Sequence, residues 1–434
     1  ELALTGYTCA DLFHQRRLLD AAEEGLARFL EQTTDCTPLY VLGLPVRADG
    51  QLFNAAAVVH HGSVLGVVPK SVLPAYNEYY EPRWFAPAEA AISQTVRLGG
   101  TTVPFGTDIL FRDDANPFLC VGVEICEDLW SPIPPSSRLA LAGASVIVNP
   151  SASNDLVGKA DYRRDLVRQQ SARCLAAYAY CSAGIGESTT DLVFGGHAFV
   201  AENGTVLVEA ERFRTPPQIT TADVDLDFLQ HERMHNTTFG RAVHRELGGR
   251  SDVDTPAVDS GRIVSFRTTP SAVPTPLEHP VDPHPFVPGD RARRRERCRE
   301  IFAIQSIGLA TRVDHIGCRD AVIGLSGGLD STLALLVTVE SFRRLGLDPG
   351  GIHAVTMPGF GTSDRTRTNV EKLCSALSVP LETVTIEASC RRHFSDIGHD
   401  GSTRDVTYEN VQARERTQIL MDKANLVGGL VVGT

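Results

Sequence analysis

Short runs of apolar residues alternate with longer polar stretches through the first 248 residues. Four runs are rich in β-branched or small apolar residues and end near Gly, Pro or Asn, which is typical of buried strands. They cover residues 40–44, 55–59, 119–125 and 144–149. Residues 11–32 instead place Leu12, Leu19, Leu26 and Leu30 on one helical face. The pattern predicts a layered α/β domain over residues 1–248.

The periodicity is lost over residues 249–288, where Pro, Thr, Ser and His dominate. This composition predicts a linker. From residue 289 an Arg-rich helical stretch leads to a strand at 321–325. Strand and helix then alternate over residues 331–345, 352–357, 367–377 and 381–386, and residues 426–432 are again strand-like. This rhythm predicts a second domain at 289–434, a doubly wound parallel α/β domain.

The composition is that of a folded globular protein, with 42% hydrophobic and 22% charged residues. The 41 basic and 53 acidic residues give a net charge of −12, so we expect neither nucleic acid nor a membrane surface as a partner. No apolar run approaches the ~20 residues of a membrane-spanning helix. Ten cysteines without a CxxC pair favour a reducing compartment, and we expect a cytoplasmic protein.

Both ends of the sequence fall inside patterned segments. The chain begins at Glu1 rather than Met, at what reads as the exit of a strand, and the apolar run 426–432 stops at Gly433 and Thr434. We therefore expect the N-terminus of the first domain and the C-terminus of the second to be missing from this sequence.

A glycine-rich loop follows the predicted strand at residues 321–323. It comprises Gly324, Leu325, Ser326, Gly327, Gly328, Leu329, Asp330 and Ser331. Its glycines let the backbone approach phosphate oxygens, and the next helix offers free N–H groups at its N-terminus. Asp330 suits a magnesium ion. The simplest interpretation is a glycine turn between a strand and a helix, but the sequence Ser-Gly-Gly-x-Asp-Ser is more specific than such a turn requires. The loop is neither a Walker A loop nor a GxGxxG motif.

A candidate nucleophile lies at the end of the run 119–125. Cys126 is surrounded by acidic residues, which raise the pKa of a thiol, so it needs a cation and a base to react. Lys70 is the candidate cation and Glu1 the candidate base. Taken singly, these residues have plainer interpretations as a packed thiol, a solvated surface charge and a residue at a chain end.

Glu1, Lys70 and Cys126, in this order and at this spacing, resemble the catalytic triad of the nitrilase superfamily. The resemblance implies an α-β-β-α sandwich with Cys126 as nucleophile and Glu1 as general base. Lys70 and a backbone N–H near Glu127 would stabilise the tetrahedral oxyanion. Glu81 matches the second, positioning glutamate of that superfamily.

The loop at 324–331 is similar to the pyrophosphate loop of the N-type ATP pyrophosphatases, whose fold resembles that of the adenine nucleotide alpha hydrolases. A nitrilase-like domain followed by this loop resembles the glutamine-dependent NAD synthetase family, as do residues 140–153, 186–192 and 405–414. The resemblance implies a C–N ligase that hydrolyses glutamine and uses the ammonia, with ATP, to convert deamido-NAD to NAD, AMP and pyrophosphate. Because water would destroy an acyl-adenylate, we expect an ammonia channel. We also expect a homo-oligomer.

The resemblance also implies binding residues. The expected glutamine-binding or positioning residues are Tyr76, Glu81, Glu127, Ser153 and Lys159. In the second domain, the loop at 324–331 and Thr434 match ATP-binding positions. Asn410 matches a position that binds deamido-NAD, and Asp330 would ligate Mg²⁺. The family continues beyond the Gly-Thr pair with an acidic segment that completes this site.

Two other functions remain open at this point. The chain could be a nitrilase-type amidohydrolase whose ATP-binding domain is regulatory or degenerate, and ATP-dependent product formation distinguishes this from a ligase. It could also be a degenerate subunit used for assembly, which ammonium release from glutamine would exclude. A further motif, His231-Glu-Arg-Met-His235, matches the zinc-binding HExxH. No third ligand follows at metzincin spacing, so we favour a plain polar helix.

Overall fold

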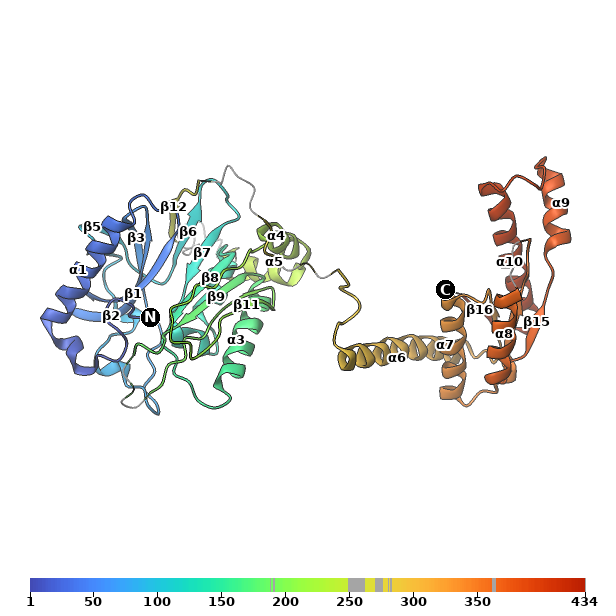
Figure 1. The fold of residues 1–434 in the computed structure, drawn as a ribbon, viewed down its shortest axis with the longest axis horizontal. Coiled ribbons are helices and arrows are strands. Elements are labelled where there is room, and N and C mark those ends of the chain that lie inside the picture. Colours follow the sequence, from blue (N-terminus) through green and yellow to red (C-terminus); the bar gives the residue numbers. More distant parts are fainter. Residues whose placement is uncertain are drawn as a thin grey trace. The chain divides into compact units, whose positions relative to one another are not determined.

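The computed structural model describes residues 1–187, 189, 192–248, 262–269, 276–279, 281, 283–360 and 364–433. The chain divides into two compact units, Glu1–Val281 and Asp282–Thr434. Figure 1 shows the helices and strands of each unit. None of the helices in the described ranges is both long and apolar enough to cross a membrane.

The first unit contains two main sheets packed face to face (Figure 1). The smaller is antiparallel and consists of β1 (Tyr40–Ala48), β2 (Gln51–His60) and β3 (Ser63–Pro69). The larger has the spatial order β11 (Thr205–Glu209), β10 (Ala198–Glu202), β9 (Ala177–Ser182), β8 (Val146–Ser151), β7 (Cys120–Val123), β6 (Ile109–Asp113) and β12 (Arg262–Phe266). A separate ribbon pairs β4 (Thr95–Leu98) with β5 (Thr101–Pro104).

Helices cover the outer faces of both sheets. Helix α1 (Arg16–Gln32) covers the smaller sheet, whereas α2 (Pro135–Leu141) and α3 (Lys159–Cys174) cover the larger one. The remaining helical segments are α4 (Leu226–His235), α5 (Thr237–Val243), the 3₁₀ turns η1 (Ala10–His14), η2 (Glu81–Arg83), η3 (Ala88–Ala90) and η4 (Cys126–Trp130), and the π-helical turn η5 (His244–Gly248). The predicted α-β-β-α sandwich is confirmed.

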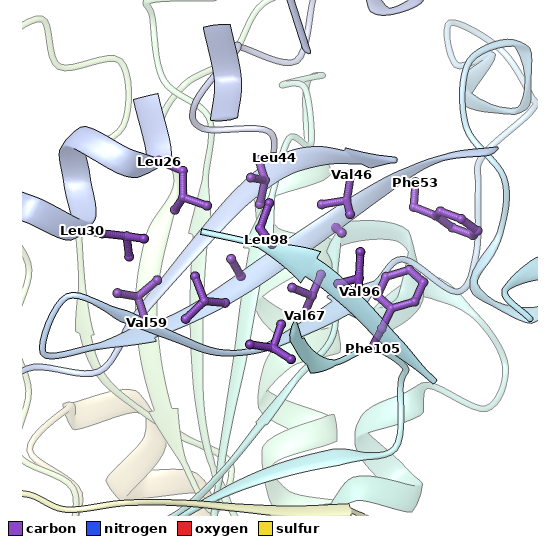
Figure 2. Packing of buried hydrophobic residues seen from close by; sticks show 14 residues of the cluster. Leu26, Leu30, Leu44, Val46, Phe53, Val59, Val67, Val96, Leu98 and Phe105 are labelled. Atoms are coloured by element: carbon purple, nitrogen blue, oxygen red, sulfur yellow. The ribbon is translucent and has the colours of Figure 1, made fainter. Parts of the chain in front are cut away.

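Three apolar clusters hold these layers together. Figure 2 shows the cluster between α1 and the smaller sheet, in which Leu26 and Leu30 of α1 pack against the strands. A second cluster fills the space between the sheets, and a third lies under α2 and α3. Leu12, predicted on the same helical face, is 58% exposed. It lies in η1, which the extended backbone of Gln15 separates from α1.

The stretch predicted to be a linker contains a strand, so that prediction is wrong for residues 262–266. Strand β12 pairs in parallel with β6 and extends the larger sheet, and the first unit continues to Val281. Arg262 pairs with Asp108 at 2.5 Å, and Phe266 is buried. A five-residue strand with a single fully buried side chain is too short to show a clear period in the sequence.

The second unit contains one parallel four-stranded sheet. Its spatial order is β15 (Leu381–Thr383), β14 (Ile352–Thr356), β13 (Ala321–Gly324) and β16 (Leu430–Val432). Its helices are α6 (Arg291–Ile316), α7 (Leu329–Leu345), α8 (Asp364–Ala376), α9 (Glu387–Ile397), α10 (Val406–Val427) and the turn η6 (Pro349–Gly351). Residues 426–427, predicted as part of a strand, instead end α10, which the left-handed Gly428 (φ 65°) terminates.

Helices pack on both faces of this sheet. Ile323 of β13 lies in an apolar cluster with residues of α7 and α8, whereas its neighbour Val322 lies in a cluster with residues of α9 and α10. The predicted doubly wound architecture is confirmed. Along the chain the strand order runs outward from β13 to β15 and then returns to the opposite side at β16. Ligands of such sheets bind at the carboxyl ends of the strands where the order reverses, which here is the end of β13.

Candidate active site

The fold brings the three predicted catalytic residues of the first unit together from distant parts of the chain. Lys70 directly follows β3 of the smaller sheet, Cys126 follows the end of β7 in the larger sheet, and Glu1 lies beside both. The Nζ atom of Lys70 lies 2.7 Å from Oε1 of Glu1 and 2.6 Å from Oε1 of Glu81. All four side chains are buried. The structure therefore forms a buried ammonium flanked by two carboxyl groups.

The Glu1 carboxylate is oriented by donors from both sheets. Asn54 Nδ2 of β2 donates to its Oε1 at 2.6 Å, and the N–H of Ala152, just after β8, donates to its Oε2 at 2.8 Å. Burial opposes ionisation of Glu1. The charge and the hydrogen bond of Lys70 act against burial, and the pKa of Glu1 is lowered. Glu1 and Glu81 in turn overcome the effect of burial on Lys70 and raise its pKa. The resting site thus contains an ionised Glu1 and a charged Lys70.

Glu81 has a different protonation state because it shares the same lysine. Burial, together with the negative charge of Glu1, raises the pKa of Glu81 to about 7, although Lys70 opposes the shift. The hydroxyl of Tyr7 donates to Glu81 Oε1 at 2.8 Å. The second glutamate therefore titrates close to neutrality, whereas the first remains ionised.

Cys126 occupies a strained turn at the first residue of η4. Its φ of 45° lies in the left-handed region, which is unfavourable for a residue with a Cβ. Its N–H donates to Asn149 Oδ1 at 2.8 Å, which stabilises this turn. Burial raises the pKa of the Cys126 thiol to about 12, with a further contribution from Glu1 and an opposing one from Lys70. The resting Cys126 side chain is therefore a neutral thiol.

The turn also leaves one backbone donor available beside the thiol. The N–H groups of Cys126 and Asp128 are used by Asn149 Oδ1 and by the Ile125 carbonyl. Within the described ranges the N–H of Glu127 has no acceptor. It is therefore the backbone donor of this turn that fits the predicted role beside Lys70.

A pocket of about 220 Å³ opens onto Cys126. Its lining residues are Pro74, Tyr76, Asn77, Glu78, Tyr79, Cys126, Glu127, Trp130, Ser153, Leu156 and Lys159. Four of the residues predicted to bind or position glutamine therefore line one cavity with the nucleophile. The exception is Glu81, which lies buried behind it against Lys70.

The polar lining of this pocket pairs an acid with a cation. The Tyr76 hydroxyl donates to Glu127 Oε1 at 2.7 Å, and burial raises the pKa of Glu127. Lys159 Nζ lies 3.3 Å from the Tyr79 hydroxyl and 5.5 Å from the ring centres of Tyr79 and Trp130. Burial, followed by the charge of Arg163, lowers the pKa of Lys159. An amino-acid zwitterion presents the complementary pair of charges.

The predicted phosphate loop of the second unit lies at the carboxyl end of β13, where the strand order reverses. Gly327 has a φ of 83°, which only glycine adopts readily. The hydroxyls of Ser326 and Ser331 lie 3.2 Å apart. In the described part of the chain, the N–H groups of Leu329 and Asp330 at the start of α7 have no acceptor. This arrangement suits an anion at a helix N-terminus.

The remaining predicted residues of the second unit are less constrained. Asp330 is exposed in the first turn of α7. Asn410 is exposed on α10, a helix that lies against β13 through the contact of Leu420 with Gly324. Thr434 lies outside the described residues. Among the described residues of the second unit, no hydrogen bond joins Asn410 to the loop that contains Asp330.

Several residues that shape the site were not predicted from the sequence. Four of them form hydrogen bonds with the predicted site residues or with their neighbours in the chain. They are Tyr7, Asn54, Asp128 and Asn149. In the sequence, the only feature that marked these residues is that they lie at strand ends or near the motifs. The HExxH segment forms α4, as expected of a polar helix, and the described residues contain no cluster of three potential metal ligands.

Two family models match this chain, one in each unit. The family model described as carbon-nitrogen hydrolase matches residues 1–233, more than half of the chain. The chain belongs to the carbon-nitrogen hydrolase family. A second model, described as NAD synthase, matches residues 303–434. The carbon-nitrogen hydrolase match confirms the resemblance predicted from Glu1, Lys70 and Cys126.

Two relatives and one solved structure that are similar to this chain all carry the name glutamine-dependent NAD synthetase. The chain is 43% identical to the glutamine-dependent NAD(+) synthetase of Mycobacterium bovis over 440 residues, which cover 100% of this chain and 63% of the relative. It is 29% identical to the enzyme of that name from Thermotoga maritima, covering 67% of the relative. A solved structure of glutamine-dependent NAD+ synthetase from Acinetobacter baumannii with ADP aligns at 23% identity and a TM-score of 0.43, covering 100% of this chain and 67% of that one.

The buried Glu81 generates a prediction about pH and stability. Its pKa is about 7 when folded and about 4.3 when unfolded, so the folded state binds the extra proton between these values. Stability from this group is therefore present at low pH and lost as pH rises through 7. Relative to Glu81→Gln, the wild type should lose roughly 2 kcal/mol of unfolding free energy between pH 5 and pH 7.

The measurement is urea denaturation followed by tryptophan fluorescence. Both tryptophans, Trp84 and Trp130, lie in the first unit, so the signal reports on that unit. Subtracting the variant from the wild type removes pH effects that the two proteins share. A difference that stays constant between pH 5 and pH 7 would show that Glu81 does not titrate there.

Proposed function

We propose that this protein is a glutamine-dependent NAD synthetase. The first unit would hydrolyse glutamine to glutamate and ammonia. The second would use ATP and that ammonia to convert deamido-NAD to NAD, with release of AMP and pyrophosphate. The names of the relatives and the two family matches support this proposal.

One observation carries the proposal. A single chain contains both a pocket in which a cysteine adjoins a buried glutamate–lysine pair and a Ser-Gly-Gly-x-Asp-Ser loop at the switch point of a parallel sheet. The first arrangement can release ammonia from an amide, and the second can activate a carboxylate with ATP. A simple amidohydrolase would need only the first.

In the proposed glutaminase reaction, Glu1 takes the Sγ proton while Cys126 attacks the side-chain amide carbon of glutamine. Since the pKa of the thiol is raised and that of Glu1 is lowered, this transfer must accompany the attack rather than precede it. Lys70 Nζ and the Glu127 N–H would stabilise the oxyanion. Glu1 returns the proton to the leaving nitrogen, and ammonia departs.

Hydrolysis of the thioester completes the first half of the cycle. Glu1 would deprotonate a water molecule, which attacks the thioester carbon, and the proton returns to Sγ as glutamate leaves. In the pocket, Lys159 would bind the α-carboxylate of glutamine and Glu127 would face its ammonium group, with Tyr76 and Ser153 as hydrogen-bonding partners. Glu81 would hold Lys70 in place without touching the substrate.

In the proposed synthetase reaction, ATP binds with its phosphates on the loop at residues 324–331. The nicotinate carboxylate of deamido-NAD attacks the α-phosphorus, pyrophosphate leaves, and an acyl-adenylate forms. Ammonia then attacks the acyl carbon and AMP departs with the bonding electrons. We assign Asn410 to deamido-NAD and Thr434 to ATP on the family resemblance.

The residues at this loop fit a magnesium ion. Magnesium is usually bound by one or two carboxylates together with substrate phosphates and water, and Asp330 offers one exposed carboxylate beside the loop. When bound, the ion would neutralise charge on the departing pyrophosphate. The protein's part is to hold the phosphates with backbone N–H groups and to present Asp330.

We also propose how ammonia reaches the second site, and in which oligomeric state and compartment the protein works. Ammonia that escapes into water is mostly protonated and unreactive, so we propose that it passes between the two sites through the protein. We further propose a homo-oligomer in the cytoplasm, where the Cys126 thiol would stay reduced.

The nucleophile can be tested directly in the full-length protein. Cys126→Ala should lose ammonium release from glutamine by at least ~10⁴-fold, because the covalent step disappears. It should still form NAD from added ammonium chloride, since the second site is chemically separate. Cys120→Ala is the control, because Cys120 is also buried and lies on β7. Ammonium release by Cys126→Ala at the wild-type rate would contradict the assignment.

The role of Asp330 can be tested in the same way. Asp330→Asn keeps the shape but removes the charge, so AMP and pyrophosphate formation should fall by ~10²-fold or more. Glutamine hydrolysis without ATP should not change. Asp396→Asn, at another exposed carboxylate of the second unit, should leave both activities intact. Unchanged pyrophosphate release from Asp330→Asn would mean that this carboxylate is not a metal ligand.

A further inference from the structure

The catalytic groups of the first unit come from two separate sheets. Lys70 follows β3 in the smaller sheet and Cys126 follows β7 in the larger one. The space between the sheets is filled by apolar side chains, which do not fix a separation as sharply as hydrogen bonds do. The chemistry nevertheless needs Lys70 Nζ and Cys126 Sγ in a defined relation.

A buried carboxylate connects these two strand ends. Asp128 Oδ1 accepts from the N–H groups of Ser71 at 3.0 Å and Val72 at 2.8 Å, and its Oδ2 accepts from the Ile125 N–H at 2.8 Å. Ser71 and Val72 directly follow Lys70, and Ile125 directly precedes Cys126. One side chain therefore joins the backbone of the lysine segment to the backbone of the cysteine turn.

We propose that Asp128 is a positioning residue that fixes the cysteine turn against the lysine segment. This inference rests on the proposed glutaminase function. Asp128 is 1% exposed and does not line the pocket, so it acts through Lys70 and Cys126 rather than on the substrate. It differs from Asn149, which holds Cys126 from within the larger sheet alone.

The backbone hydrogen bonds of the bridge favour a carboxylate, although burial raises the pKa of Asp128 to about 8. Three N–H groups converge on two oxygens, and each oxygen must act only as an acceptor. An asparagine at position 128 has the same shape but only one acceptor oxygen. Whichever way its amide turns, an NH₂ group faces an N–H, either at Ile125 or at Ser71 and Val72. Asp128→Asn therefore breaks one end of the bridge while the volume stays filled.

The first unit provides a matched control. Asp113, at the end of β6, is also fully buried and accepts N–H groups, those of Ala115 and Thr268, each at 3.0 Å. Thr268 follows β12, the neighbour of β6, so this carboxylate links segments of the larger sheet only. Asp113→Asn therefore replaces another buried, N–H-bound Asp without touching the connection between the sheets. Against the effect of burial, hydrogen bonds from Thr268 and Ala115 lower the pKa of Asp113, whereas burial raises that of Asp128.

The test measures glutamine hydrolysis by the full-length wild type, Asp128→Asn and Asp113→Asn, at a temperature where tryptophan fluorescence shows each first unit to be folded. In Asp128→Asn, kcat should fall ~10²-fold, as expected from a displacement of about 1 Å between reacting groups. KM should change less than kcat, because Ser153 and Lys159 lie outside both segments that Asp128 joins, and only Glu127 of the binding residues lies on the cysteine turn. Asp113→Asn should keep the wild-type kcat even where its melting temperature falls.

Each other outcome counts against the role or against the function. An active wild type with an equally active Asp128→Asn overturns the role of Asp128 alone, and so does an equal fall of kcat in Asp113→Asn. If Asp128→Asn does not fold, Asp128→Ser is measured in its place. Failure of both to fold while Asp113→Asn folds means that Asp128 serves folding rather than positioning. A wild type without glutaminase activity overturns the proposed function, and this inference with it.

Discussion

The buried ammonium of Lys70 is the interaction on which the first unit depends. A charged group removed from water is destabilising unless it is paired and hydrogen-bonded, and removing one partner typically costs about 3–5 kcal/mol. Lys70 meets this requirement through Glu1 and Glu81, each within 2.7 Å of Nζ. Burial, together with the negative charge of Glu1, raises the pKa of Glu81 to about 7 beside this lysine. Burial also raises the pKa of the nearby Cys126 thiol, and the same lysine acts against this larger effect.

The charge cluster explains why so many surrounding groups are polar and ordered. Asn54 and the Ala152 N–H complete the hydrogen bonds of Glu1, and Tyr7 completes those of Glu81. The second unit works differently, because its loop leaves backbone N–H groups exposed at the start of α7. Its ligand would supply the negative charge that the first unit contains within itself. The two sites thus use opposite solutions, one preformed and buried, the other open.

Much of this architecture could be predicted from the sequence, and the reasons for the failures are physical. Glu1, Lys70, Cys126 and the loop at 324–331 carry recognisable motifs. The bridges of Asp128 and Asn54 join residues that are 56 and 53 positions away, and no local pattern marks such pairs. Strand β12 was missed because five residues at the edge of a sheet show little periodicity. Local signals marked the predicted catalytic residues, whereas the groups that hold them in place follow from the packing of the two sheets.

The proposed function requires that one chain pass the amide nitrogen of glutamine to NAD. The most direct measurement supplies the full-length protein with glutamine labelled with ¹⁵N in its side-chain amide, together with ATP, deamido-NAD and an excess of unlabelled ammonium. Mass spectrometry of the product NAD then reports the source of its amide nitrogen. Direct transfer gives NAD that carries the label with little dilution. NAD whose label is diluted in proportion to the added ammonium would contradict direct transfer, and an absence of NAD formation from glutamine would contradict the proposed function itself.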